Sequence, residues 1–419
     1  MPRHMTTNSQ RVASGALAIV GALDTKGAEV AFVRDQIAAH GHRAIVIDTG
    51  VLGAPACPAD VTRERVAEAG GVSLAALAAA GDRGHAVMTM AAGAERVVRD
   101  MFDAGDIRGI IGLGGGAGTS VATAAMRALP LGVPKVMVST LAGADVSAFV
   151  GVSDIVMIPS IVDISGLNRI SRGVLARAAA AVCAMCDADV TDAAGRPLIA
   201  ASMFGNTTAC VEAARAALEA QGFEVLVFHA TGAGGRTMES LIDAGQIAGV
   251  LDVTTTEWAD ELAGGVLTAG PARLEAAART GTPAVVAPGC LDMVNFWAPE
   301  TVPDRYRGRR FYQHNANITL MRTTPEENAE LGRIIAGKLN ASRGPVAVYL
   351  PLRGLSVISA PGGPFHWPEA DEALFRALRD HLRPDIPLHA LDVNINDPAF
   401  AAAMVEGLIA MTTSRSTRP

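Results

Sequence analysis

The chain has 419 residues, more than one hydrophobic core normally organises, so we expect two domains. Hydrophobic residues make up 50% of the chain and charged residues 18%, a balance that excludes intrinsic disorder and favours layered α/β structure. The formal net charge of -7 opposes attraction to phosphate backbones, so nucleic acid is not an expected partner.

The sequence also restricts the compartment. It contains no uninterrupted apolar run of about 18 residues, so no membrane span or membrane partner is expected. The apolar run at residues 12–23 follows two arginines, but its pattern recurs later in the chain, so we interpret it as a first buried strand and not as a signal peptide. Five scattered cysteines are typical of a reducing compartment. We therefore predict a cytoplasmic protein.

The order of the predicted elements repeats along the chain. Residues 17–48 indicate a strand, a turn, a helix and a second strand, and residues 198–229 repeat that order. Two further pairs of matching segments follow in the same sequence, 103–111 with 243–251 and 132–139 with 281–288.

Short Val/Ile runs that alternate with helices predict parallel sheets with helices on both faces. The expected fold class is therefore α/β, with two Rossmann-like parallel-sheet domains related by internal duplication. Residues 1–190 would form the first domain and residues 191–419 the second.

The loop after the first predicted strand contains Asp24 and Lys26, and Lys26 is one of only three lysines in the chain. Ligands bind outside the carboxyl ends of the strands in open parallel sheets. Lys26 is therefore a candidate phosphate ligand and Asp24 a candidate for a metal-bound water. An aspartate that caps the helix, beside a solvated lysine, is the alternative.

A glycine-rich loop at residues 112–120 separates a later predicted strand from a helix. Glycines let main-chain amides approach an anion closely, and the helix N-terminus adds partial positive charge. The spacing matches neither a dinucleotide fingerprint nor a P-loop, and a tight strand-to-helix turn is the alternative. The candidate nucleotide-binding residues in this loop are Gly114, Gly115, Gly116, Gly118, Thr119 and Ser120.

The second half offers further candidates at its strand ends. His229 is a candidate acid or base, and a second glycine loop follows it, with Thr231, Gly232, Gly234, Gly235 and Arg236 as candidate ligand residues. Glu257 and Asp260 lie on one helical face and are candidates for acid–base catalysis or a divalent cation, or alternatively acids that stabilise a helix N-terminus. Cys183 and Cys186 form a CxxC pair, but no second pair or nearby histidine completes a zinc set, so we interpret them as small core residues and expect no structural metal site.

Arg305, Arg307, Arg309 and Arg310 precede His314-Asn315 and form the main basic cluster. Such a run is typical of a solvated loop, and closure over phosphates is the alternative.

Several stretches are similar to a family of uncharacterised bacterial and fungal proteins related to the ATP-binding N-terminal domain of the tomato mosaic virus resistance protein. They include Gly-Gly-Gly-Ala-Gly-Thr at 114–119, Asp-Ile-Ser-Gly-Leu-Asn at 163–168 and Asp-Met-Val-Asn-Phe at 292–296, with 129–140, 203–205, 228–232, 314–315, 319–323 and 395–398. Relatives more often have Gly-Gly-Ser-Gly-Gly-Thr in the first stretch, so Gly116 lacks a hydroxyl that is a candidate phosphate contact in the family.

The resemblance implies two Rossmann-like domains, ATP binding and a homodimer. The leading hypothesis is an ATP-binding protein, with Mg²⁺ as an accompanying ion, that acts on a small-molecule metabolite in a cleft between the domains. Two alternatives stay open. One is a non-catalytic module whose bound nucleotide modulates a protein-binding surface, and the other is a metabolite-binding protein that does not use ATP.

Overall fold

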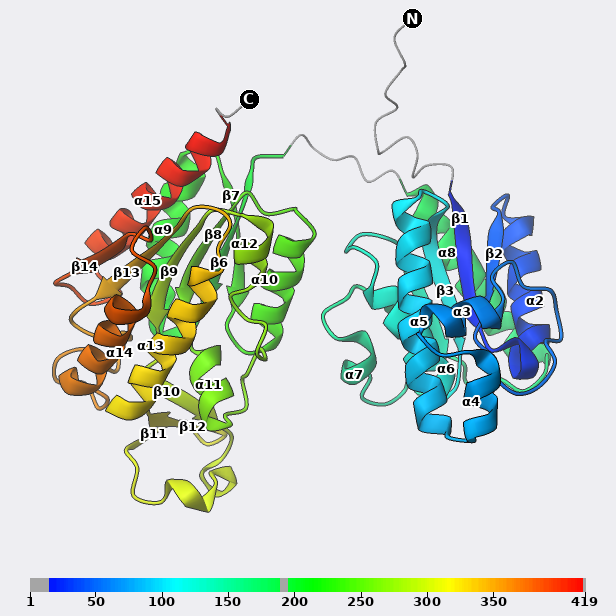
Figure 1. The fold of residues 1–419 in the computed structure, drawn as a ribbon, viewed down its shortest axis with the longest axis horizontal. Helices are drawn as coiled ribbons and strands as arrows, with labels where there is room; N and C mark the ends of the chain where they lie inside the picture. The colour runs from blue at the N-terminus through cyan, green and yellow to red at the C-terminus, as the bar shows by residue number, and fades with distance from the viewer. Residues whose placement is uncertain (1–14, 189–194, 417–419) are drawn as a thin grey trace, which may run out of the picture. The chain divides into compact units, whose positions relative to one another are not determined.

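The structure is a computed structural model that describes residues 15–188 and 195–416. The chain divides into two compact units, residues 1–191 and 192–419, each built on its own parallel sheet (Figure 1). The predicted boundary at residues 190 and 191 lies outside the described residues. The α/β class with two parallel-sheet domains is confirmed.

The N-terminal unit contains a five-stranded sheet in which all neighbouring strands are parallel. In spatial order its strands are β2 (Ala44–Asp48), β1 (Ala16–Gly21), β3 (Ile107–Gly114), β4 (Lys135–Ser139) and β5 (Val156–Pro159). Every residue of β1 is buried, because helices cover both faces of the sheet. This burial explains why the strand is apolar throughout and does not alternate.

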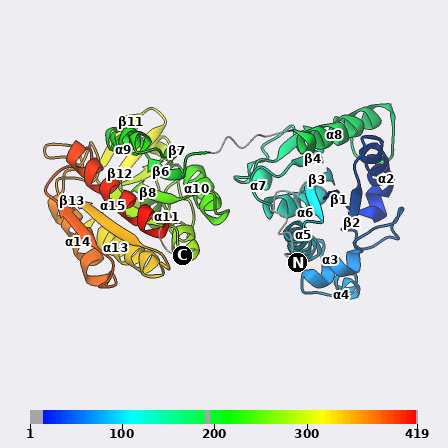
Figure 2. The same cartoon turned by 90° about the horizontal axis from the view of Figure 1, so that it is seen from above.

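Two helix layers enclose this sheet, as Figure 2 shows. One face packs against α2 (Leu23–Ala39) and α8 (Arg169–Asp187). The opposite face packs against α3 (Arg63–Ala69), α4 (Leu74–Ala80), α5 (Arg83–Asp103) and α6 (Gly116–Arg127). The short helix α7 (Ser147–Val150) lies in the connection between β4 and β5.

The C-terminal unit contains a six-stranded parallel sheet. In spatial order its strands are β7 (Glu224–His229), β6 (Leu198–Met203), β8 (Gly249–Thr254), β9 (Ala284–Gly289), β13 (Val346–Pro351) and β14 (Leu388–Leu391). In both sheets the second strand in the chain lies beside the first, which lies beside the third. This shared order agrees with the predicted duplication.

Helices also cover both faces of the second sheet. One face packs against α9 (Thr208–Ala220) and α15 (Pro398–Ser416). The other packs against α10 (Ala233–Asp243), α11 (Glu257–Ala263), α12 (Ala276–Thr280), α13 (Pro325–Asn340) and α14 (Pro368–His381). In the described part of the chain, no helix is both long enough and apolar enough to cross a membrane.

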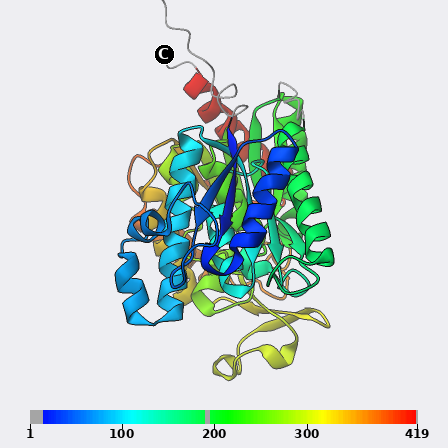
Figure 3. The same cartoon turned by 90° about the vertical axis from the view of Figure 1, so that its right-hand side faces the viewer.

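An antiparallel arm is inserted between β9 and β13 of the C-terminal unit. It consists of β10 (Met293–Phe296), β12 (Ile318–Arg322) and β11 (Phe311–Asn315), with β12 in the middle. Figure 3 shows its yellow-green segment projecting from the end of the unit. The described part of the N-terminal unit has no such arm.

The strand order creates one switch point in each sheet. In each sheet the second strand is added on one side of the first strand and the third strand on its other side. The switch point therefore lies between β1 and β3 in the first sheet and between β6 and β8 in the second. Crevices outside the carboxyl ends of such strands are where doubly wound sheets bind ligands.

Candidate functional site

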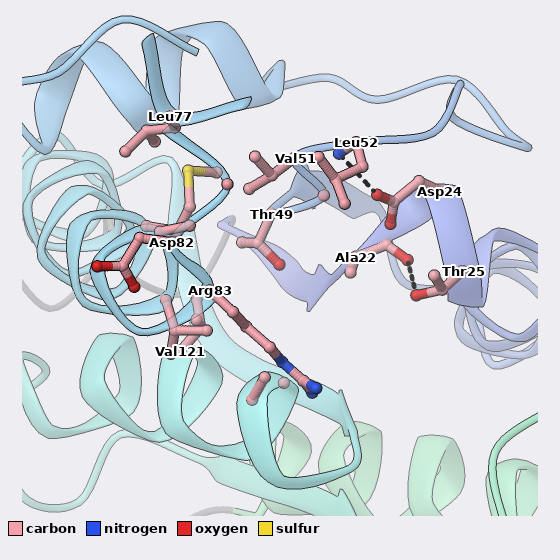
Figure 4. Close-up of a pocket in the computed structure, with 17 residues that line it drawn as sticks. Ala22, Asp24, Thr25, Thr49, Val51, Leu52, Leu77, Asp82, Arg83 and Val121 are labelled. Carbon is pink, nitrogen blue, oxygen red and sulfur yellow. Dashed lines mark hydrogen bonds between the residues drawn. The ribbon is translucent and has the colours of Figure 1, made fainter. Parts of the chain in front are cut away.

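A pocket of about 400 Å³ opens at the switch point of the N-terminal unit (Figure 4). Its walls come from the loops after β1 and β2, the first turns of α6, the end of α4 and the start of α5. The volume lies within the range of small-molecule sites. The pocket therefore occupies the place where the fold predicts a ligand.

The N-terminus of α6 borders this pocket without a side-chain cap. Gly115 is the N-cap residue, and among the described residues no side chain accepts a hydrogen bond there. The neighbouring helices α3, α4 and α5 are capped by Thr62, Ser73 and Asp82, respectively. The first-turn amides of α6 are therefore free to bind water or an anion.

The fold does not require most of the glycines in this loop. None of Gly114, Gly115, Gly116 and Gly118 has a positive φ angle. A Cβ on Gly114 would lie 2.8 Å from the Cα of Gly118, so packing demands glycine at 114. A Cβ on Gly118 would meet nothing nearer than the Leu113 carbonyl oxygen, at 3.4 Å. Gly118 lines the pocket, and its missing side chain leaves the α6 amides open to a ligand.

Three charged residues line the pocket: Arg83, Asp24 and Asp82, the residue whose carboxylate caps α5. Arg83 is exposed at the first position of α5 and extends into the pocket (Figure 4). Among the described residues, no hydrogen bond or ion pair engages its guanidinium. The Oδ2 atom of Asp24 accepts hydrogen bonds from the Leu52 and Gly53 amides at 3.2 and 3.3 Å. The sequence indicated Asp24 as a candidate ligand but gave no sign of Arg83, because an arginine at the first position of a helix is common on protein surfaces.

The remaining wall of the pocket is mostly apolar. Leu77, Met90 and Val121 belong to the core of this face, and Val51 packs against it. Leu52 stands at the pocket with 79% of its surface exposed. Such a wall suits a flat apolar group next to the charged end of the pocket.

Six of the eight predicted nucleotide ligands do not line this pocket: Gly114, Gly115, Gly116, Thr119, Ser120 and Lys26. The buried Thr119 hydroxyl lies 2.7 Å from the Ser139 hydroxyl, and the Ser120 hydroxyl donates to the Gly116 carbonyl at 3.0 Å. The Lys26 ammonium donates to the Ile164 carbonyl. Nucleotide contacts by Thr119, Ser120 and Lys26 stay predictions.

The second glycine loop already binds a carboxylate of the protein. The amides of Gly232 and Gly235 donate to Glu257 Oε1 at 2.8 and 3.1 Å. A Cβ on Gly235 would lie 2.2 Å from Glu257 Oε2, and one on Gly234 would lie 1.9 Å from the His229 carbonyl oxygen. Here packing demands the glycines, and Glu257 occupies the place of an external anion.

Glu257 also belongs to a buried ionic network around Arg273, which is 1% exposed. The Arg273 guanidinium donates to both oxygens of Asp252 at 2.5 and 2.7 Å, to Glu257 at 2.7 Å and to Glu239 at 3.2 Å. Burial raises the pKa of Glu239. The arrangement holds three carboxylates on one guanidinium inside the fold.

Asp260 faces a different partner from Glu257. Its carboxylate accepts hydrogen bonds from the main-chain and side-chain nitrogens of Asn295 at 2.6 and 2.8 Å. Burial raises the pKa of Asp260 to about 7. Glu257 and Asp260 therefore do not converge on one open site, and catalytic roles for them stay predictions.

His229 and Thr231 line a second pocket of about 500 Å³ together with His314 and Asn315 from the arm. The fold thus brings together residues that are more than eighty positions apart in the sequence. Arg236 is outside this group, because it donates to the Thr268 carbonyl at 3.0 Å.

The basic cluster before His314 is occupied by contacts within the protein. Arg309 holds both oxygens of Glu327 at 3.0 and 2.6 Å, and Arg307 pairs with Asp304 at 2.9 Å. Arg305 and Arg310 donate to main-chain carbonyls, each at 3.1 Å.

Comparison with known proteins gives matches along both units. The model described as Uncharacterised protein family (UPF0261) N-terminal domain matches residues 15–191, and its C-terminal counterpart matches residues 196–412. A UPF0261 protein of Clostridium tetani is 50% identical over 395 residues, which cover 94% of this chain and 98% of that protein. A second, from Rhizobium meliloti, is 49% identical over 389 residues, covering 92% and 96%.

The tomato (Solanum lycopersicum) protein named ToMV resistance protein Tm-1 is 41% identical to this chain over 337 residues. The match covers 78% of this chain but only 44% of the tomato protein.

The buried network makes Arg273 a test of stability. Arg273→Met would leave the carboxylates of Asp252 and Glu257 buried without a counter-charge, so we expect the unfolding free energy to fall by about 3–5 kcal/mol. Urea denaturation followed by tryptophan fluorescence measures this loss, because all three tryptophans belong to the C-terminal unit. Arg279→Met, which breaks an exposed pair with Asp243, should cost less than about 1 kcal/mol. Equal losses would contradict the account.

The raised pKa of Asp260 makes the stability of the protein depend on pH. An unfolded aspartate loses its proton near pH 4, whereas the native Asp260 keeps it until about pH 7. Between these values the native state binds the extra proton, so stability from this group falls as the pH rises from about 4 to 7. Urea midpoints at pH 5 and pH 8 should therefore differ more for the wild type than for Asp260→Asn. Parallel pH profiles for the two proteins would refute this role of burial.

Proposed function

The chain belongs to the family described as Uncharacterised protein family (UPF0261), and from that premise we propose that it binds ATP in the pocket of its N-terminal unit. The observation that carries the proposal is the uncapped first turn of α6, which faces a pocket containing an unpartnered arginine. Main-chain amides and a guanidinium are the groups that bind phosphate oxygens most effectively.

The phosphates occupy the charged end of the pocket in this proposal. The α6 amides donate hydrogen bonds to the phosphate oxygens near Gly118, where no side chain obstructs them, and Arg83 neutralises part of the phosphate charge. The adenine packs on the apolar wall that contains Val51, Leu77 and Val121. Thus both parts of a nucleotide find a matching surface in one pocket.

Asp24 is the residue that would hold Mg²⁺ with the nucleotide. Magnesium is usually bound by one or two carboxylates together with substrate phosphates and water, so a single carboxylate at the pocket is sufficient. A Cβ on Gly50 would lie 2.7 Å from Asp24 Oδ1, so any larger residue at position 50 would clash with the Asp24 carboxylate. When bound, the ion would supply positive charge to the phosphates.

The proposal includes a small metabolite as a second ligand, and the two alternatives from the sequence remain outcomes of one experiment. Calorimetric titration with ATP and magnesium, followed by product analysis with a metabolite mixture, distinguishes them. ATP binding without turnover would favour the nucleotide-modulated binding module. Metabolite binding without any ATP binding would favour the third reading and would refute the present proposal.

The Gly118→Ala variant separates a ligand contact from a folding effect. The added methyl fits the fold, and alanine is favoured over glycine in a helix by about 0.5–1 kcal/mol, so the protein should become slightly more stable. Its ATP affinity should fall, because the methyl lies in the path of the phosphates. Calorimetry and thermal unfolding measure the two effects.

Gly337→Ala is the matched control for this variant. It adds a methyl at an exposed position in the last turn of α13, where nothing lies within 4 Å, so it should not destabilise the protein and should leave ATP binding unchanged. If Gly118→Ala binds ATP as well as the wild type does, the phosphate site is not at α6.

Arg83 provides an independent test, because it is predicted to contact only the phosphates. Arg83→Gln should weaken ATP binding by about 1–3 kcal/mol, the cost of a lost hydrogen bond to a charged group, and leave adenosine binding unchanged. Arg34→Gln removes an arginine that is paired with Asp35 on α2 and should affect neither ligand. Equal weakening of ATP and adenosine would exclude a phosphate role for Arg83.

A further inference from the structure

We propose that the C-terminal unit has a second binding site, for an uncharged planar heteroaromatic ring, in the pocket of about 500 Å³ between its strand ends and the arm. This site is formed by residues of the C-terminal unit alone, so it does not rest on the proposed nucleotide site.

The pocket lies at the carboxyl ends of β6 and β7 in the second sheet. Phe204 directly follows β6, and His229 is the last residue of β7, so one wall comes from the carboxyl ends of neighbouring parallel strands. Trp297, His314 and Asn315 come from the arm and form the opposite wall. The arm thus adds a wall to the open edge at the carboxyl ends of these two strands, and a pocket results.

Aromatic rings are concentrated around this pocket. Phe, Trp and Tyr make up only 4% of the chain, yet Phe204 and Trp297 both line the pocket, together with two of the nine histidines. The rings of Phe204 and His229 meet edge to face with their centroids 5.3 Å apart. Trp297 remains 49% exposed. A flat ring would cover this exposed indole and gain stacking contacts from it.

The charges around the pocket favour an uncharged ligand. The described lining includes no Asp, Glu, Lys or Arg. The arginines of the arm point to other partners, because Arg309 holds Glu327 and Arg310 donates to the His366 carbonyl. No fixed charge is therefore available for a phosphate, a carboxylate or an ammonium group.

Polar side chains at the pocket can form hydrogen bonds with the edge of a heteroaromatic ring. Asn206, which is 9% exposed, donates from its side-chain nitrogen to Met293 Sδ at 3.7 Å, and Asn315 Oδ1 accepts from the Asn317 amide at 2.9 Å. A side-chain amide has two donor hydrogens and two acceptor lone pairs, so each asparagine keeps donor and acceptor capacity for a ligand. Amide side chains form paired hydrogen bonds with the ring nitrogen and amino group of heterocycles. Stacking surfaces combined with amides favour a heteroaromatic ring over an aliphatic ligand of equal size.

Fluorine NMR of the full chain labelled with 5-fluorotryptophan tests this site. The chain has three tryptophans, so the Trp297 signal is assigned by its loss in Trp297→Phe. Adenine and nicotinamide serve as probes, and cyclohexanecarboxamide serves as a non-aromatic control. We expect both probes to shift the Trp297 signal saturably and to leave the signals of Trp258 and Trp367 in place, while the control causes no shift.

Two variants locate the probe. His229→Leu removes an exposed ring from the pocket and should weaken the response of Trp297 by about tenfold, near the low end of the cost of losing one stacking partner. His85→Leu, an exposed histidine in the N-terminal unit, should leave the response unchanged. An unmoved Trp297 signal, or an equal shift with cyclohexanecarboxamide, would overturn the proposal. Gly118→Ala should not alter the response, so failure here is distinguishable from failure of the ATP site.

Discussion

Main-chain amides at the carboxyl edge of a parallel sheet need acceptors, and the rest of the structure depends on how each unit supplies them. At α2 the acceptor is Asp48, whose buried carboxylate receives the Leu23 amide at 3.0 Å. In the second glycine loop the acceptor is Glu257. At α6 no side chain of the described residues takes this position. The α6 terminus is consequently the place where an external anion completes the hydrogen bonding of the fold.

The two units have therefore diverged at equivalent points. The third strand of the first sheet leads into Gly114–Gly118, whereas the third strand of the second sheet leads into three buried threonines and Glu257. Gathering Asp252 and Glu257 around Arg273 has a desolvation cost, so this network fixes one arrangement of the loops more than it adds stability. With its loop amides satisfied internally, the C-terminal unit has its open pocket beside the arm instead. The two units are therefore proposed to bind different ligands, ATP in the N-terminal unit and an uncharged heteroaromatic ring in the C-terminal unit.

The sequence predicted the fold well, because buried parallel strands and the repeated order of elements leave a local signal. It predicted the site less well. The two glycine loops look alike in sequence, and only the contact between Gly232 and Glu257, 25 residues apart, distinguishes the loop that is already filled. The rarity of lysine does not single out Lys26 in the structure, since Lys26, Lys135 and Lys338 all bind carbonyl or carboxylate oxygens of the protein, and a phosphate contact by Lys26 stays a prediction. Arg83 gave no signal, because its place beside α6 depends on tertiary packing.

Hydrogen exchange of the full chain, with and without ATP and magnesium, tests the central claim most directly. The account predicts that ATP slows exchange in the first turn of α6, at Gly116, Ala117 and Gly118, and leaves the Gly232 and Gly235 amides unchanged because Glu257 already protects them. Protection at the second loop without protection at α6, or no change at either, would contradict it.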